Sequence, residues 1–327
     1  MEYDFDDVAR VSCDARLNRT LTKSPHLLFL VRVVYVGPTP RHEDIVLEPC
    51  QWIDALPERI LQEFVLCGSH WSHVRPYLLE HPACRSIRRV FIQMSPIFDW
   101  LSIRGIFALP ELEELFLTLR DSMHDELGTV APSKLRHLSV RLTAGYNTES
   151  LFDILIAAVG SQLRSLSFSG RIDRQDGTEQ LSAALNASCR GLRRLKMYVY
   201  TLDPAPMPPV VDRALLSLHP TLEYLHCYED TYSDAMFKSL PSTLKVLELH
   251  HHQAFPYAAA VVDLLGRVPP ICPSLTHFTI HTDERDPPYA GSVAEACRAA
   301  GVCFTIARNI EFSLSPFVPL HTRVDHS

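Results

Sequence analysis

The sequence lacks any excess of positive charge. Its 327 residues include 31 lysines and arginines against 38 aspartates and glutamates, which gives a formal net charge of −7. Proteins that bind nucleic acid or an anionic membrane surface need basic side chains to neutralise phosphate groups. The composition therefore argues against nucleic acid and membranes as partners.

Long apolar runs and a secretory leader are also missing from the N-terminal region. The first seven residues, Met-Glu-Tyr-Asp-Phe-Asp-Asp, are acidic, whereas a secretory signal begins with a positively charged segment. The longest apolar stretch that follows, Leu27 to Val36, is interrupted by Arg32 and is too short to span a bilayer. We therefore expect a cytoplasmic or nuclear protein.

The nine cysteines lack the close pairing of a disulfide or zinc framework, since no two lie within three residues of each other. Cys227 and Cys297 stand where the surrounding pattern has apolar residues, as reduced cysteines do in a core. Cys67, His70 and His73 follow one another at three-residue steps that do not converge on one helical face. We expect these three residues to serve core packing rather than to bind a metal ion.

Motifs of the common enzyme classes are absent as well. The sequence has no phosphate-binding loop, no Gly-x-Ser-x-Gly, no His-Glu-x-x-His and no dinucleotide-binding glycine pattern. Its acidic residues are scattered among turns rather than placed on apolar elements, where their pKa values would shift. We expect neither an enzymatic activity nor a cofactor.

What the sequence does contain is a short sequence motif that occurs eight times and that we call the phrase. An apolar residue is followed by two variable residues, a second apolar residue, one variable residue and a third apolar residue. The phrases span residues 87–92, 112–117, 135–140, 163–168, 192–197, 222–227, 244–249 and 275–280. Successive phrases begin 22 to 31 residues apart, and such a period is typical of a solenoid. The second and third apolar residues are two apart, so they share one face of a strand.

Several phrases are followed by an apolar stripe at helical spacing. The clearest stripes are Val211, Ala214, Leu215 and Leu218; Val261, Leu264, Leu265 and Val268; and Val293, Ala296, Cys297 and Ala300. A wide helix on one side and a narrow strand on the other force a stack of such units to curve. The pattern predicts an α/β, leucine-rich-repeat-like curved solenoid, with about eight to ten parallel strands on the concave face and helices on the convex face. The second apolar residues of successive phrases, from Leu115 to Phe278, should then lie in one row.

The phrases also suggest boundaries along the chain. We expect a lead-in over residues 1–24, an irregular first repeat or N-terminal cap over 25–86, the solenoid over 87–310 and a tail over 311–327. Within the irregular part, residues 25–36 suit a strand. Residues 57–80 suit a helix that carries Ile60, Leu61, Phe64, Val65 and Trp71.

Together with their uneven spacing and the lead-in from Arg16 to Leu28, the phrases resemble the leucine-rich-repeat portion of fungal F-box-type proteins. The resemblance covers residues 16–306, and the F-box itself is not visible before residue 16. It implies a protein-binding repeat module that serves as a substrate-recognition subunit related to F-box ubiquitin-ligase receptors. The alternative is a non-catalytic repeat scaffold with no link to ubiquitin transfer.

The concave face of such a solenoid carries the side chains that flank the second and third apolar residues of each phrase. Arginine, tyrosine and histidine combine apolar area with directional hydrogen bonds, which suits recognition. We predict that this face binds a protein partner or an acidic peptide, and that the chain is a monomer or a subunit of a larger complex. The predicted contact residues are Arg141, Arg171, Arg194, Lys196, Tyr198, Tyr224, His226, Tyr228, His250 and His281. The alternative is a face that is merely solvated.

The run His250-His251-His252 raises the question of a metal site. Alternation along a strand places His250 and His252 on one face, near His226 and His281, and imidazoles bind zinc and copper. No carboxylate or cysteine with a recognisable spacing completes the set. We therefore expect a solvated histidine cluster without a metal ion.

Overall fold

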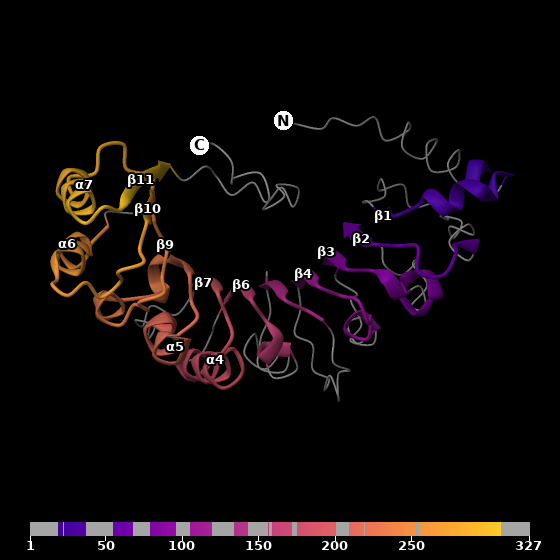
Figure 1. The fold of residues 1–327 in the computed structure, drawn as a ribbon, viewed down its shortest axis with the longest axis horizontal. Coiled ribbons are helices and arrows are strands. Elements are labelled where there is room, and N and C mark those ends of the chain that lie inside the picture. Colours follow the sequence, from indigo (N-terminus) through magenta and orange to yellow (C-terminus); the bar gives the residue numbers. More distant parts are fainter. Residues whose placement is uncertain are drawn as a thin grey trace.

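The computed structural model describes residues 19–21, 23–36, 55–67, 79–95, 105–119, 134–142, 156, 159–171, 175–200, 209–218, 220–252 and 255–308. They form an α/β structure around one parallel sheet of eleven strands, in which every strand pairs with its neighbours in the sequence. The elements follow an arc, with the strands along its inner side and helices α4 to α7 on its outer side (Figure 1). We call the inner side of the sheet the concave face. The strands are β1 (Val33–Val36), β2 (Glu63–Cys67), β3 (Arg89–Ser95), β4 (Glu114–Leu119), β5 (His137–Leu142), β6 (Ser165–Arg171), β7 (Arg194–Tyr200), β8 (Tyr224–Tyr228), β9 (Val246–His251), β10 (His277–Thr282) and β11 (Cys303–Arg308).

The core is built from rows of apolar side chains that run across the strands. The second apolar residues of the phrases are paired strand by strand, as the sequence predicts. This row consists of Val90, Leu115, Leu138, Leu166, Leu195, Leu225, Leu247 and Phe278. Each of these residues is at most 2% exposed. A second row, from Ile92 to Ile280, runs parallel to it and is formed by the third apolar residues. Each repeat thus completes the core of the next one.

Helices cover the outer side of the sheet between successive strands. They are α4 (Gln175–Ser188), α5 (Val210–Leu218), α6 (Ala258–Gly266) and α7 (Ala290–Ala299). Short 3-10 helices are η1 (Pro25–Leu30), η5 (Pro82–Ser86), η6 (Gly160–Gln162), η7 (Glu229–Thr231) and η8 (Asp234–Lys238). Helix α4 packs against α5 and α6 against α7, while η8 fills the place between α5 and α6. The shortest repeat therefore has room for only one or two helical turns on this side.

The helical stripes are confirmed where the structure describes them, except at their last residues Val268 and Ala300, which lie beyond their helices and are exposed. Val211, Ala214 and Leu215 are buried on α5, as the spacing predicts. Val268 lies beyond the end of α6 and is 94% exposed. It precedes Pro269, and the proline ring disfavours helical backbone for the residue before it. The helix accordingly ends at Gly266.

The prediction of a helix over residues 57–80 is wrong in its described part. Residues Glu63–Cys67 form strand β2, which pairs with β1 on one side and β3 on the other. Phe64 and Val65 are both buried, so the two faces of this strand are covered. A short apolar run of this kind fits a buried strand as well as a helix, and periodicity does not separate the two. The irregular segment thus supplies two strands, β1 and β2, and β11 follows the last phrase, so the sheet has eleven strands rather than the expected eight to ten.

The expectations about membrane-spanning segments and about cysteines can be compared with the described residues. No helix among them is long and apolar enough to cross a membrane. Cys227 and Cys297 are fully buried free thiols, as expected of cysteines that replace core apolar residues. The acidic N-terminal residues, the segment with His70 and His73 and the predicted C-terminal tail lie outside the described part.

Candidate functional site

The C-terminal half of the concave face carries a continuous set of rings. Tyr198 on β7 lies edge-on to Tyr228 on β8, with ring centroids 4.2 Å apart. Tyr228 stacks on His250 of β9 at 4.3 Å and on His226 at 5.2 Å. His226 in turn stacks on His281 of β10 at 5.4 Å. The register of the repeats therefore brings five of the predicted residues into one cluster.

These rings are less exposed than the sequence pattern suggests. His226 is 3% exposed, His250 2% and Tyr228 7%, because neighbouring side chains on the concave face cover them. Tyr198 and His281 remain partly exposed. An approaching partner would therefore contact the partly exposed rings of Tyr198 and His281. The buried rings between them would support these two from below.

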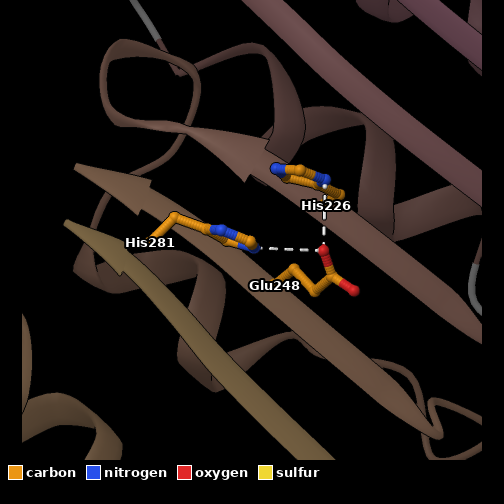
Figure 2. A group of neighbouring side chains, drawn as sticks. All are labelled: His226, Glu248 and His281. Atoms are coloured by element: carbon orange, nitrogen blue, oxygen red, sulfur yellow. Dashed lines mark hydrogen bonds and ion pairs between the residues drawn. The ribbon is translucent and has the colours of Figure 1, made fainter. Parts of the chain in front are cut away.

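Glu248 on β9 lies between two of the histidines (Figure 2). Its Oε2 is 3.2 Å from His281 Nε2 and 3.4 Å from His226 Nδ1. The hydroxyl of Tyr224 also donates a hydrogen bond to this carboxylate. Alternation along the phrase places Glu248 on the concave face. Only the structure shows that it contacts histidines on both strands that flank β9, namely β8 and β10. No sequence spacing marks Glu248 as the partner of these histidines, but the structure brings it to two of them.

Burial and neighbouring charges set the ionisation of this cluster. Burial holds the pKa of His226 well below its usual value, and the nearby Lys196 and His281 lower that pKa further. Burial alone would raise the pKa of Glu248, but the hydrogen bond and charge of His281, with help from Tyr224 and Lys196, lower it. Near neutral pH the cluster thus contains an ionised carboxylate beside a neutral imidazole.

The predicted basic residues in the middle of the concave face are only partly brought together. Arg194 and Lys196 lie two apart on β7, and the Arg194 guanidinium sits 5.1 Å from the centre of the Tyr224 ring. Arg141 lies on β5, two strands away, or about 10 Å in the direction of the hydrogen bonds. Arg171 is the last residue of β6, and its side chain is outside the described part. Among the described side chains of β6, those on the concave face between β5 and β7 are serines, at positions 165, 167 and 169.

A second basic surface, missed by the sequence reasoning, lies at the amino ends of the strands. It is formed by the first variable residue of each phrase, and backbone hydrogen bonds link these residues from one repeat to the next. The row reads Arg88, Glu113, Arg136, Arg164, Arg193, Glu223, Lys245 and Thr276. The charge alternates along it except at Arg136, Arg164 and Arg193, where three cations follow one another. We call these three residues the arginine row.

The arginine row borders a solvent-open pocket. The pocket has a volume of about 360 Å³ and is lined by Lys134, Arg136, Gln162 and Arg164. Lys134 forms an ion pair with Glu111 at 2.7 Å. Neither Arg136 nor Arg164 has an ion-pair partner among the residues that the structure describes. The chemistry of this pocket suits an anion, because guanidinium groups pair with carboxylates and phosphates through parallel hydrogen bonds.

Sequence reasoning overlooked the arginine row because it followed only the alternation that points to the concave face. The signal was present in the phrases, since three consecutive ones begin Leu135-Arg136, Leu163-Arg164 and Leu192-Arg193. No protein-family model matches the sequence, and no curated protein matches it. The candidate sites therefore rest on the geometry and on physical chemistry.

Proposed function

We propose that the chain is a protein-binding repeat module of the leucine-rich-repeat type, which binds an acidic or phosphorylated segment of a partner protein. The segment lies over the arginine row and reaches Arg194 and Lys196 at the adjoining part of the concave face. The observation that carries this proposal is the pocket in which Arg136 and Arg164 stand side by side without a described acidic partner.

The repulsion between neighbouring arginines suggests that the arginine row serves a function. Adjacent strands of a sheet are about 4.8 Å apart, and like charges placed directly opposite each other destabilise a sheet. Elsewhere the same row avoids that cost by alternation: Glu223 pairs with Lys245 at 2.9 Å and with Arg193 at 3.6 Å. Between Arg136 and Arg164 no acidic side chain among the described residues offsets this cost. An anionic partner would remove it on binding.

The concave face offers a second contact area next to the arginine row. Tyr198, Tyr224 and His281 are partly exposed, and the rings of Tyr198 and His281 pack on the buried rings of Tyr228 and His226. Partly exposed aromatic side chains that pack on buried rings lose little conformational entropy when a partner binds. The serines of β6 leave room for the backbone of a bound segment between β5 and β7.

The resemblance to F-box-type proteins supports a more specific proposal. In it, the repeat stack selects a substrate for ubiquitin transfer and its partner segment belongs to that substrate. Stable association of the full-length protein with a ubiquitin-ligase adaptor in a native extract would support this role. Partner capture without any adaptor would favour the alternative of a scaffold that does not take part in ubiquitin transfer.

The binding proposal is tested by affinity capture from a native extract with wild type and with the double variant Arg136→Glu, Arg164→Glu. We expect the variant to lose partners that wild type retains, and we expect added salt to weaken their capture, because the interaction is between charges. Phosphatase treatment of the extract distinguishes a phosphorylated partner from an acidic one. Capture of a phosphorylated partner should be lost after the treatment, whereas capture of an acidic partner should be unchanged.

A matched control also replaces two arginines by glutamates, but on the outer side of the arc, where the helices lie. In the variant Arg213→Glu, Arg267→Glu, both altered residues lie near outer helices and pair with exposed acids. This control should capture the same partners as wild type. Equal capture by wild type and by the Arg136→Glu, Arg164→Glu variant would refute the proposal.

A further inference from the structure

The distances around Glu248 lie at or just beyond the long end of the hydrogen-bond range, and they also suit the ligands of a metal ion. N–H···O hydrogen bonds cluster near about 2.9 Å, and charge-assisted ones are shorter. The Oε2 atom of Glu248 instead lies 3.4 Å from His226 Nδ1 and 3.2 Å from His281 Nε2. Ligand atoms bound at about 2.05 Å to a tetrahedral zinc ion are about 3.3 Å apart. Two sides of the ligand triangle already have this length.

The third side of the triangle needs only a small adjustment. All three ligand atoms lie within 4.8 Å of one another. The rings of His226 and His281 are stacked and nearly parallel, with an interplanar angle of 7°, so the ring of His281 must turn before both nitrogens can point at one ion. The side chains of His281 and Glu248 are partly exposed, so they have more freedom to rotate toward a common ion than the buried His226.

The ligand types indicate which ions would bind. Two imidazoles and one carboxylate form a set that binds zinc and other divalent transition metals. Calcium and magnesium prefer oxygen ligands throughout, so this set disfavours them. We propose that His226, Glu248 and His281 bind a divalent transition-metal ion of the zinc class through Nδ1, Oε2 and Nε2, respectively.

The surroundings of the three residues fit such a site. Each ligand stands on a different strand of the rigid sheet, β8, β9 or β10, and the hydroxyl of Tyr224 orients the carboxylate of Glu248. The side chain of His226 is 4% exposed, whereas those of Glu248 and His281 are 24% and 22% exposed. The site thus has one buried ligand and two partly exposed ligands, so an ion bound there would be open to a further ligand from the concave side. This inference does not depend on the proposed function.

Lys196 is the neighbour that opposes the ion. It lies opposite His226 in the register of β7 and β8, and its charge acts on both His226 and Glu248. A cation bound at the three ligands would be repelled by a protonated lysine. The variant Lys196→Met keeps most of the side chain's length but removes the charge, so it should bind the ion more tightly than wild type.

Cobalt(II) is a suitable probe, because its visible spectrum reports the number and geometry of its ligands and zinc displaces it. The purified chain, freed of metal with a chelator, is titrated with cobalt(II) and then with zinc(II). We expect wild type to show a saturable spectrum of a low-coordinate site that one equivalent of zinc abolishes. His281→Ala and Glu248→Gln should each weaken binding at this site by at least tenfold, as expected when a ligand is lost.

His277→Ala serves as the matched control, since His277 is an exposed histidine on the same strand β10 and lies outside the cluster. It should retain the wild-type spectrum. Circular dichroism of each variant checks that the fold is intact. The proposal is overturned if wild type shows no saturable site, or if the spectrum of folded Glu248→Gln equals that of wild type.

Discussion

Glu248 Oε2 lies 3.2 Å from His281 Nε2, although 33 residues separate the two in the sequence. In the register of β9 and β10, Glu248 is opposite Thr279, and His281 is opposite His250. The contact is therefore a diagonal one across two neighbouring strands, within reach of long side chains. A shift of one residue in this register would turn one of the two side chains into the core and abolish the cluster. The polar cluster thus depends on the same alignment that builds the apolar rows.

The apolar row predicts a large loss of stability when one of its members is truncated. Leu195 is fully buried between Leu166 and Leu225. We expect Leu195→Ala to lower the free energy of unfolding by about 2–5 kcal/mol, from lost burial and the cavity left behind. Hydrogen exchange should show the weakening in both β6 and β8, because neighbouring repeats share their interface.

Leu30→Ala is the control for this variant, because Leu30 is 72% exposed. Its effect in urea-induced unfolding should remain within about 0.5 kcal/mol. An unfolding curve of Leu195→Ala that coincides with wild type would show that the row does not carry the core.

The buried histidines predict that stability falls in mild acid. The pKa of His226 is well below its usual value in the folded chain because of burial, and that of His250 is lowered to about 4 for the same reason. As the pH falls below about 6.5, the unfolded chain binds protons that the folded chain does not. The stability contributed by the neutral imidazoles is fully present above that pH and is lost below it. Each group contributes at most about 1.4 kcal/mol per pH unit.

Urea-induced unfolding of wild type and His226→Gln between pH 7.5 and pH 5 tests this expectation. The variant should show a shallower loss of stability, since glutamine does not titrate. Parallel pH profiles for the two proteins would contradict the assignment of His226 as a buried neutral group.

The arginine row predicts that one charge reversal stabilises the free chain. Arg164→Glu converts three successive cations into an alternating set, so we expect the free energy of unfolding to rise by about 0.2–1 kcal/mol at low ionic strength. The gain should disappear in 1 M salt, where charges are screened within about 3 Å. Thermal unfolding at the two salt concentrations measures both effects.

Arg285→Glu provides the comparison, because Arg285 is exposed and its sequence neighbours Glu284 and Asp286 are acidic. This reversal should stabilise nothing. If Arg164→Glu is less stable than wild type at low salt, the arginine row is not a site of repulsion, and the argument for an anionic partner loses its basis.

The sequence predicted the apolar rows because burial and strand alternation act within each phrase. Leu195 and its equivalents are buried wherever the phrase occurs, whatever its neighbours contain. Strand β2 could not be predicted in the same way, because the apolar run around Phe64 carries no period that separates strand from helix. The cluster at Glu248 depends on distances between repeats that the sequence does not encode locally. The arginine row was readable, since its arginines occupy one position of three consecutive phrases.

The most direct test of a partner site at the arginine row is a photo-cross-linking residue placed at Gln162, which lines the pocket with Arg136 and Arg164. The same residue placed at Arg213 on α5, on the helical side, is the comparison. Irradiation in a native extract and mass spectrometry then identify the partner peptide attached at each position. Our account predicts that the Gln162 position attaches to an acidic or phosphorylated segment and the Arg213 position does not. A neutral or basic segment at Gln162, or the same segment at both positions, would contradict it.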